Sequence, residues 1–288
     1  MQNPDKKNLL FDRDLIAKRL NNEYIKEDFV GELISNDIHQ RLAPISRKFN
    51  NAIIIGPNPQ TFPKTSATIG GEIVFEHFST LKKLDNIALI DAENLTLPHK
   101  KYDLIISFLD LQIINNVPNY LQQINAHLTP DGLMLIAAIG GNSFTELRLA
   151  WLKADEEIIG GVYSRIAPFI DVKSAGSLLQ NSGFAMPMAD IDHHIIRYAS
   201  PLNLMQEIKK FAASNPLKQK PNKPITKKHL SKAIENYIEI ASDDDGRIRA
   251  SLDILWLLGW SPDASQPKPL APGSAKMSLT KVLGNKNE

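Results

Sequence analysis

The sequence predicts an α/β fold: a seven-stranded, mainly parallel sheet with helices on both faces and helical additions at both ends of the chain. Two observations carry this prediction. Short apolar runs, such as residues 52–55 and 104–108, have the uninterrupted character of strands buried on both faces. Segments of helical spacing lie between these runs, and such alternation is typical of βαβ units in a parallel sheet.

The individual elements follow from these two periodicities. We expect strands at 52–55, 72–75, 87–90, 104–108, 133–139, 189–191 and 194–198, the last two closing the sheet. In the same part of the chain we expect helices at 117–127, 145–160 and 172–182. A turn signal, Thr129-Pro130-Asp131-Gly132, separates the first of these helices from the strand that follows. Residues 61–70 are expected to form a poor helix, because they contain Pro63, several threonines and Gly70.

Composition limits the class of protein. The 288 residues are 43% hydrophobic and 23% charged, close to the averages for globular proteins, which argues against global disorder. A net charge of +1 gives no overall attraction to nucleic acid or to an anionic membrane. The chain has no cysteine, which excludes disulfides, thiolate metal sites and cysteine nucleophiles. No apolar run is long enough to span a bilayer, and the N-terminus lacks a signal-peptide core, so we expect a cytoplasmic protein of a bacterium.

The organisation along the chain predicts three parts. Residues 1–49 carry apolar residues at helical spacing and form an N-terminal helical extension. Residues 50–200 form the α/β domain, and residues 201–288 form a C-terminal helical region with a proline-rich tail. Residues 209–232 contain eight lysines and no acidic residue. We interpret them as a solvated connector rather than a nucleic-acid site, because Phe211 is the only aromatic residue among them.

The first candidate site lies at the carboxyl ends of the strands, where open parallel sheets bind ligands. The first strand ends in Gly56-Pro57-Asn58-Pro59, in which only Gly56 suits close approach of a ligand and the prolines lack a donor. Glu76 lies about 20 residues further on, where an acidic side chain would bind ribose hydroxyls; a solvated glutamate explains the spacing equally well. Asp91 and Ala92 follow the third strand, where they could bind an adenine ring or form a local Asx turn.

The second candidate site is the loop Gly140-Gly141-Asn142-Ser143, between a strand and a helix. It could bind an anion or a substrate, although helix capping explains Asn142 or Ser143 without any ligand. Residues 160–169, with Arg165, are expected close to this loop. No His/Asp/Glu cluster has metal-ligand spacing, so we expect no metal site. No catalytic residue can be assigned: Tyr163, His193 or Asp110 could act as a general base, and the spacing does not select among them.

Several motifs resemble those of a known family, the bacterial relatives of the mitochondrial complex I assembly factor 5. The first is Leu10-Phe11-Asp12-Arg13, and the most specific are the stretches at 140–184 and 265–275. The stretches that carry the resemblance are 10–13, 91–97, 102–109, 128–132, 140–141, 146–148, 156–161, 166–171, 182–184 and 259–275. The resemblance therefore covers nearly the whole chain.

This resemblance implies a class I S-adenosylmethionine (SAM) methyltransferase fold, which is Rossmann-like. It implies SAM as cofactor, at Gly56, Glu76, Asp91 and Ala92. It also implies a substrate or partner loop at Gly140, Gly141, Arg148 and Arg165. The implied partner is a protein such as a respiratory complex I subunit, since the mitochondrial member is reported to hydroxylate an arginine of such a subunit.

The sequence departs from the family at the first strand. There Ile54-Ile55-Gly56-Pro57-Asn58 replaces an Asp-Leu-Gly-Cys-Gly pattern. We therefore expect SAM to bind weakly or not at all, with any residual pocket depending on Glu76 and Asp91. Two functions remain open: an enzyme acting on a protein side chain, and a non-catalytic assembly or interaction protein that has lost SAM binding.

Overall fold

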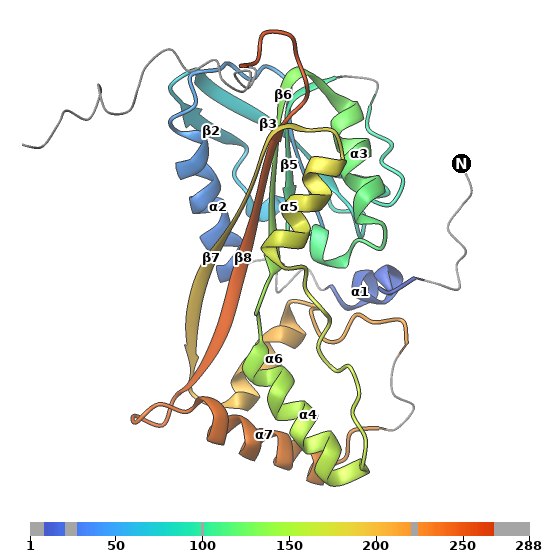
Figure 1. The fold of residues 1–288 in the computed structure, drawn as a ribbon, viewed down its shortest axis with the longest axis vertical. Helices are drawn as coiled ribbons and strands as arrows, with labels where there is room; N and C mark the ends of the chain where they lie inside the picture. The colour runs from blue at the N-terminus through green and yellow to red at the C-terminus, as the bar shows by residue number, and fades with distance from the viewer. Residues whose placement is uncertain (1–8, 21–27, 99–100, 220–223, 268–288) are drawn as a thin grey trace, which may run out of the picture.

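The computed structural model describes residues 9–20, 28–98, 101–219 and 224–267 (Figure 1). Its strands are β1 (Ala52–Gly56), β2 (Thr65–Thr68), β3 (Gly71–Ser79), β4 (Ala88–Leu89), β5 (Tyr102–Phe108), β6 (Leu128–Gly140), β7 (Ala185–Tyr198) and β8 (Ile248–Trp260). Its α-helices are α1 (Arg13–Arg19), α2 (Phe29–Leu42), α3 (Val117–His127), α4 (Thr145–Ile159), α5 (Val172–Asn181), α6 (Pro201–Lys210) and α7 (Lys227–Ala241). Two 3₁₀ turns, η2 (Pro59–Thr61) and η3 (Leu111–Ile113), follow β1 and β5.

The strands form one sheet in the order β2-β3-β1-β5-β6-β8-β7, and β4 pairs with β3 at the edge. The pairs β1–β3, β1–β5, β3–β4 and β5–β6 are parallel. The pairs β2–β3, β6–β8 and β7–β8 are antiparallel. The predicted α/β fold with a mainly parallel sheet and helical additions is confirmed.

Two hydrophobic cores lie on opposite faces of the sheet. Because side chains alternate along a strand, β1 contributes Ile53 and Ile55 to one core and Ile54 to the other. Helices α3 and α5 cover the first face, and α2 covers the second (Figure 1). A third core joins α4, α6 and α7 beyond one end of the sheet. Since β6 leads into α4 at that end, these helices lie at the carboxyl ends of the parallel strands.

The expected end of the sheet is wrong. Residues 189–191 and 194–198 belong to one strand, β7, and the sheet does not finish near Tyr198. The chain leaves the sheet, forms α6 and α7, and returns as β8 between β6 and β7. The range 201–288, expected to be helical, thus contains a central strand. The uninterrupted apolar run from 254 to 258, buried except at Leu258, explains why this segment is stable inside the sheet.

The expected helix at 61–70 is also wrong. After β1 the chain makes the short turn η2 and then forms β2, which pairs antiparallel with the start of β3. Pro63 and the β-branched Thr65 and Thr68 favour the extended backbone over a helix. Gly71, at φ +126°, supplies the turn of this hairpin. The chain after β1 therefore does not lead directly into a helix.

Candidate functional site

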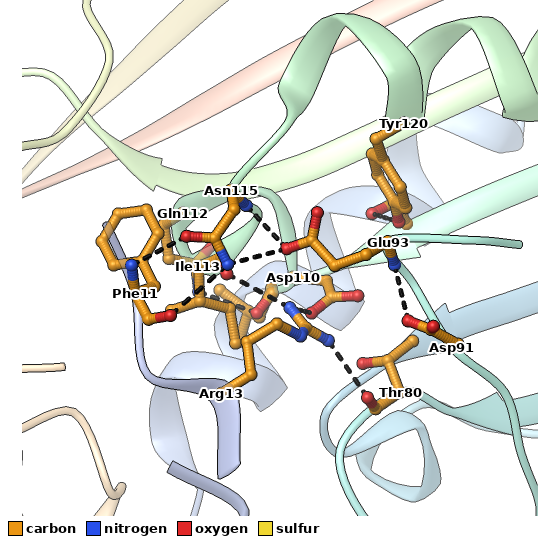
Figure 2. A network of polar contacts seen from close by, with 12 residues as sticks. Phe11, Arg13, Thr80, Asp91, Glu93, Asp110, Gln112, Ile113, Asn115 and Tyr120 are labelled. Carbon is orange, nitrogen blue, oxygen red and sulfur yellow. Dashed lines mark hydrogen bonds and ion pairs between the residues drawn. The ribbon is translucent and has the colours of Figure 1, made fainter. Parts of the chain in front are cut away.

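A network of polar contacts lies at the carboxyl ends of β3 and β5 (Figure 2). Arg13, on α1, donates to the Asp110 carboxylate at 3.0 Å and to the backbone oxygen of Thr80 at 3.0 Å. The Asp110 side chain is fully buried, and that of Arg13 is 13% exposed. A cation from the N-terminal extension thus occupies the strand ends and neutralises a buried carboxylate there.

The segment before α1 is fixed to the same place by Asn115. The Phe11 backbone N–H donates to Asn115 Oδ1 at 2.8 Å, and Asn115 donates through its N–H and its Nδ2 to Glu93. Figure 2 shows Glu93 and Asn115 beside the Arg13–Asp110 pair. Burial raises the pKa of Tyr120, and the charge of Asp110 raises it further. Tyr120 is therefore a neutral donor or acceptor here, not a base.

Several buried polar atoms at these strand ends have no hydrogen-bond partner in the described part of the chain. They come from the last residue of β3 and from residues after β1, β3 and β5: Asn58 Oδ1, Ser79 Oγ, Thr80 Oγ1, Asp110 Oδ2 and Gln112 Oε1. A buried polar group without a partner is destabilising by about 1–3 kcal/mol. Their concentration at the position where open α/β sheets bind ligands indicates a site for a polar group.

A largely apolar cavity of about 400 Å³ opens beside this cluster. We call it the strand-end cavity. The sheet contributes the residues after β1 and β5, including Pro57, Asn58 and Leu109. The helical additions contribute the rest of the wall, among them Ile16 of α1, Trp151 of α4 and Met205 of α6. Segments at both ends of the chain therefore cover the carboxyl edge of the sheet.

The loop after β1 does not have the form of a cofactor loop. A Cβ on Gly56 would lie 2.2 Å from the backbone oxygen of Phe108, so Gly56 is required for the approach of β1 to β5. Pro57 and Pro59 have no N–H, and the N–H groups of Thr61 and Phe62 already bond Asn58 and Pro59. With no following helix, the residues present do not fit the methionine end of SAM.

The other expected cofactor residues lie apart from the cavity. Glu76 is exposed in the middle of β3, opposite Ile53, and the strand ends three residues later at Ser79. The Asp91 carboxylate accepts from the Glu93 N–H and from Asn94 Nδ2, which is the local Asx arrangement. Ala92 is fully buried in the first core. Gly56, Glu76 and Asp91 are not among the described residues that line the strand-end cavity.

The glycine loop after β6 is closed by the chain itself. The Gly141 N–H bonds Ile170, and the Asn142 N–H bonds the Asp253 carboxylate at 2.7 Å. Asp253 also accepts from His193 Nδ1 at 2.7 Å, and this hydrogen bond and charge raise the pKa of His193. Gly141, at φ +56°, is needed because a Cβ would meet Asp253. The expected anion donors of this loop are therefore already paired.

Arg148, Arg165 and Gly141 do meet around a second cavity, of about 430 Å³, which Tyr163 also lines. We call it the arginine cavity. Arg165 is committed to the fully buried Asp155, with Nε–Oδ1 at 2.9 Å and Nη2–Oδ1 at 2.6 Å. Arg148 reaches only the backbone oxygen of Ala167, at 3.3 Å, and pairs with no carboxylate among the described residues. Arg148 is thus the available cation of this cavity.

The sequence reasoning missed the partners of these residues. It named Arg13 only within the motif at 10–13 and Asp110 only as a possible base, and it passed over Asp155 and Asp253. The one usable signal was the presence of Arg13 in a family motif. Within the described ranges, no group of three His, Asp or Glu side chains could hold a metal ion, and every helix is too short or too polar to cross a membrane.

The chain is similar to several known proteins. A family model described as a methyltransferase domain matches residues 34–188, more than half of the chain. The arginine-hydroxylase NDUFAF5 of Rattus norvegicus mitochondria is 32% identical over 94% of this chain and 82% of its own length. A Rickettsia prowazekii protein named as a methyltransferase is 35% identical over 54% of this chain and 69% of its own. The solved YcgJ protein of Bacillus subtilis covers 80% of this chain and 98% of its own, at 9% identity and TM-score 0.49.

The chain belongs to the methyltransferase-domain family, with a class I methyltransferase fold. Within that family it is a relative of the mitochondrial arginine-hydroxylase NDUFAF5, over most of both chains. The resemblance inferred from the sequence motifs is confirmed.

Proposed function

We propose that this methyltransferase-fold protein acts on, or assists the assembly of, a protein partner, and that SAM binds to it weakly or not at all. The hairpin that follows β1 is the observation that supports weak or absent SAM binding. Methyltransferase-like sheets hold a cofactor carboxylate with loop N–H groups and a helix N-terminus. Here the loop has two prolines, and the chain continues as a strand.

The partner is inferred from the family. NDUFAF5 relatives carry the name arginine-hydroxylase, and the resemblance to complex I assembly factors implies a protein partner such as a respiratory complex I subunit. The arginine cavity supports this proposal, since Arg148 is a cation on its wall without a carboxylate partner among the described residues. The positive charge of Arg148 suits an acidic group of a partner protein.

A second candidate function is an enzyme that keeps a small-molecule cofactor. The unpartnered atoms Thr80 Oγ1, Asp110 Oδ2 and Gln112 Oε1 favour retained binding of some polar ligand at the strand ends. Because the residues present do not fit the methionine end of SAM, we assign no catalytic step to that cofactor. If the protein is not an enzyme, the remaining alternative is a non-catalytic assembly protein.

Calorimetric titration with SAM and with S-adenosylhomocysteine tests the cofactor proposal. Losing two charge-assisted hydrogen bonds, at about 1.5–3 kcal/mol each, weakens binding by roughly a hundredfold or more. We therefore expect no saturable binding at micromolar concentrations. Micromolar binding that Asp91→Ala abolishes would refute the proposed loss. The parallel variant Glu76→Ala tests whether the exposed mid-strand carboxylate contributes anything to that binding.

Site-specific photo-crosslinking tests the partner proposal. A benzoylphenylalanine in place of Val162, an exposed residue on the wall of the arginine cavity, is expected to crosslink a partner protein in cells, and the same group at the exposed position 180 on α5 is the matched control. Equal crosslinking from both positions, or none from position 162, would contradict a partner at the arginine cavity.

A further inference from the structure

We propose that the strand-end cavity binds an amphipathic amine, with its ammonium group beside Asp28, Asn58 and Gln112 and its alkyl body in the apolar remainder. This proposal goes beyond the proposed function: it does not depend on a protein partner, and it assumes that SAM does not occupy the strand-end cavity. The cavity volume of about 400 Å³ lies within the range of small-ligand pockets, roughly 300–1,000 Å³. Its wall is almost entirely apolar, so the few polar atoms on it decide the head group.

Two of those polar atoms are acceptors that lack donors among the residues that the structure describes. Asn58, 8% exposed, donates through Nδ2 to Thr61 Oγ1, which leaves its Oδ1 buried and without a partner. Gln112 donates through Nε2 to the Leu109 backbone oxygen, which leaves its Oε1 buried and without a partner. Because both amide nitrogens already have acceptors, the amide orientations are fixed by the protein. The oxygens can therefore accept hydrogen bonds from a ligand that donates them.

A carboxylate on the same wall selects a cation. Asp28, the N-cap of α2, is 7% exposed and accepts from the Gly31 N–H at 2.7 Å. Burial raises its pKa, and hydrogen bonds from Gly31, Asn58 and Thr61 oppose that shift. No lysine or arginine pairs with Asp28 in the part of the chain that the structure describes. A carboxylate and two amide oxygens match the three donors of a primary ammonium group.

The cations on the cavity wall do not reverse this preference. Arg165 is neutralised by its buried pair with Asp155. Lys210 is exposed on α6, where water solvates its charge. A fatty acid could use Lys210, but it would leave the acceptors of Asn58 and Gln112 without donors, which is unfavourable.

Three probes that differ only in their head group test the proposal. Decylamine, decanol and decanoate are titrated into the full chain by calorimetry, each below its micelle concentration. We expect decylamine to bind at least tenfold more tightly than decanoate, with decanol between them. Decanoate binding as tightly as decylamine, or no saturable binding of any probe, would overturn the proposal.

A pair of matched cap variants locates the head group. Asp28→Asn removes the charge but keeps a residue that caps helices equally well. It is expected to weaken decylamine binding about tenfold or more and to leave decanol binding within about twofold. Asp171→Asn makes the same change at the N-cap of α5, away from the cavity. It is expected to change neither the decylamine affinity nor the decanol affinity. If Asp28→Asn fails to fold, Gln112→Met removes the second acceptor, and unchanged decylamine affinity in that variant would equally refute the proposal.

Discussion

Arg13 and Asp110 form an ion pair at 3.0 Å across 97 positions of sequence, joining the first described helix to the carboxyl end of β5. The carboxylate is fully buried, and its second oxygen, Oδ2, has no hydrogen-bond partner among the described residues. This pair closes the edge of the sheet where the fold is expected to bind a ligand. It also makes the position of α1 depend on the charge of one strand-end residue.

The first prediction concerns that pair. Arg13→Met leaves the Asp110 charge buried without its partner, so we expect a loss of about 3–5 kcal/mol in the free energy of unfolding, measured by urea denaturation. The double variant with Asp110→Asn is expected to recover part of that loss, because no unpaired charge remains. Additive effects of the two substitutions would show that the pair is not coupled.

The second prediction concerns Gly56. Gly56→Ala places a Cβ against the Phe108 backbone oxygen and is expected to destabilise the protein by about 1–3 kcal/mol or more. Gly161→Ala is the matched control, because a Cβ there has nothing within 4 Å and the backbone is not left-handed. Thermal denaturation of both variants compares them. Equal melting temperatures would mean that β1 and β5 can move apart without loss of stability.

The third prediction concerns pH. The Asp253 carboxylate raises the pKa of His193 above its ordinary value of 6.5, since the carboxylate accepts from its ring and stabilises the imidazolium. The stabilisation by His193 is therefore fully present below pH 6.5 and is lost as pH rises through the raised pKa. His193→Gln should destabilise the protein more at about pH 5.5 than at about pH 8.5. An NMR titration of His193 showing a pKa below 6.5 would contradict this assignment.

The fourth prediction separates the two arginines of the arginine cavity. Arg165→Met removes the arginine that pairs with the buried Asp155 and leaves only its contact with His229 Nε2, at 2.8 Å, so it is expected to destabilise the protein by about 3–5 kcal/mol. Arg148→Met removes one bond to a backbone oxygen and should destabilise it by about 1 kcal/mol or less. Chemical denaturation gives both values. If Arg148→Met proves as destabilising as Arg165→Met, Arg148 is structural and is not available to a partner.

The candidate sites were only partly predictable. The sequence indicated that the loop after β1 lacks donors, because proline chemistry is local, and the structure has the same prolines in a 3₁₀ turn. It placed Glu76 by its distance from Gly56, and the hairpin β2–β3 changed the geometry on which that spacing depended. The sequence placed Arg148 and Arg165 in one site, but it gave no sign that Arg165 forms an ion pair with Asp155.

By itself the sequence determined the alternation of buried strands and amphipathic helices, and hence the fold class, because both depend on periodicities within a few turns or residues. It also carried the family motifs. Only the tertiary structure decided that β8 returns between β6 and β7, that the chain after β1 forms a hairpin, and that Arg13 reaches Asp110. The first and last of these features join residues far apart in the sequence, such as Leu133 with Trp260 and Arg13 with Asp110. Their energies come from burial and charge pairing that exist only after the whole chain has folded.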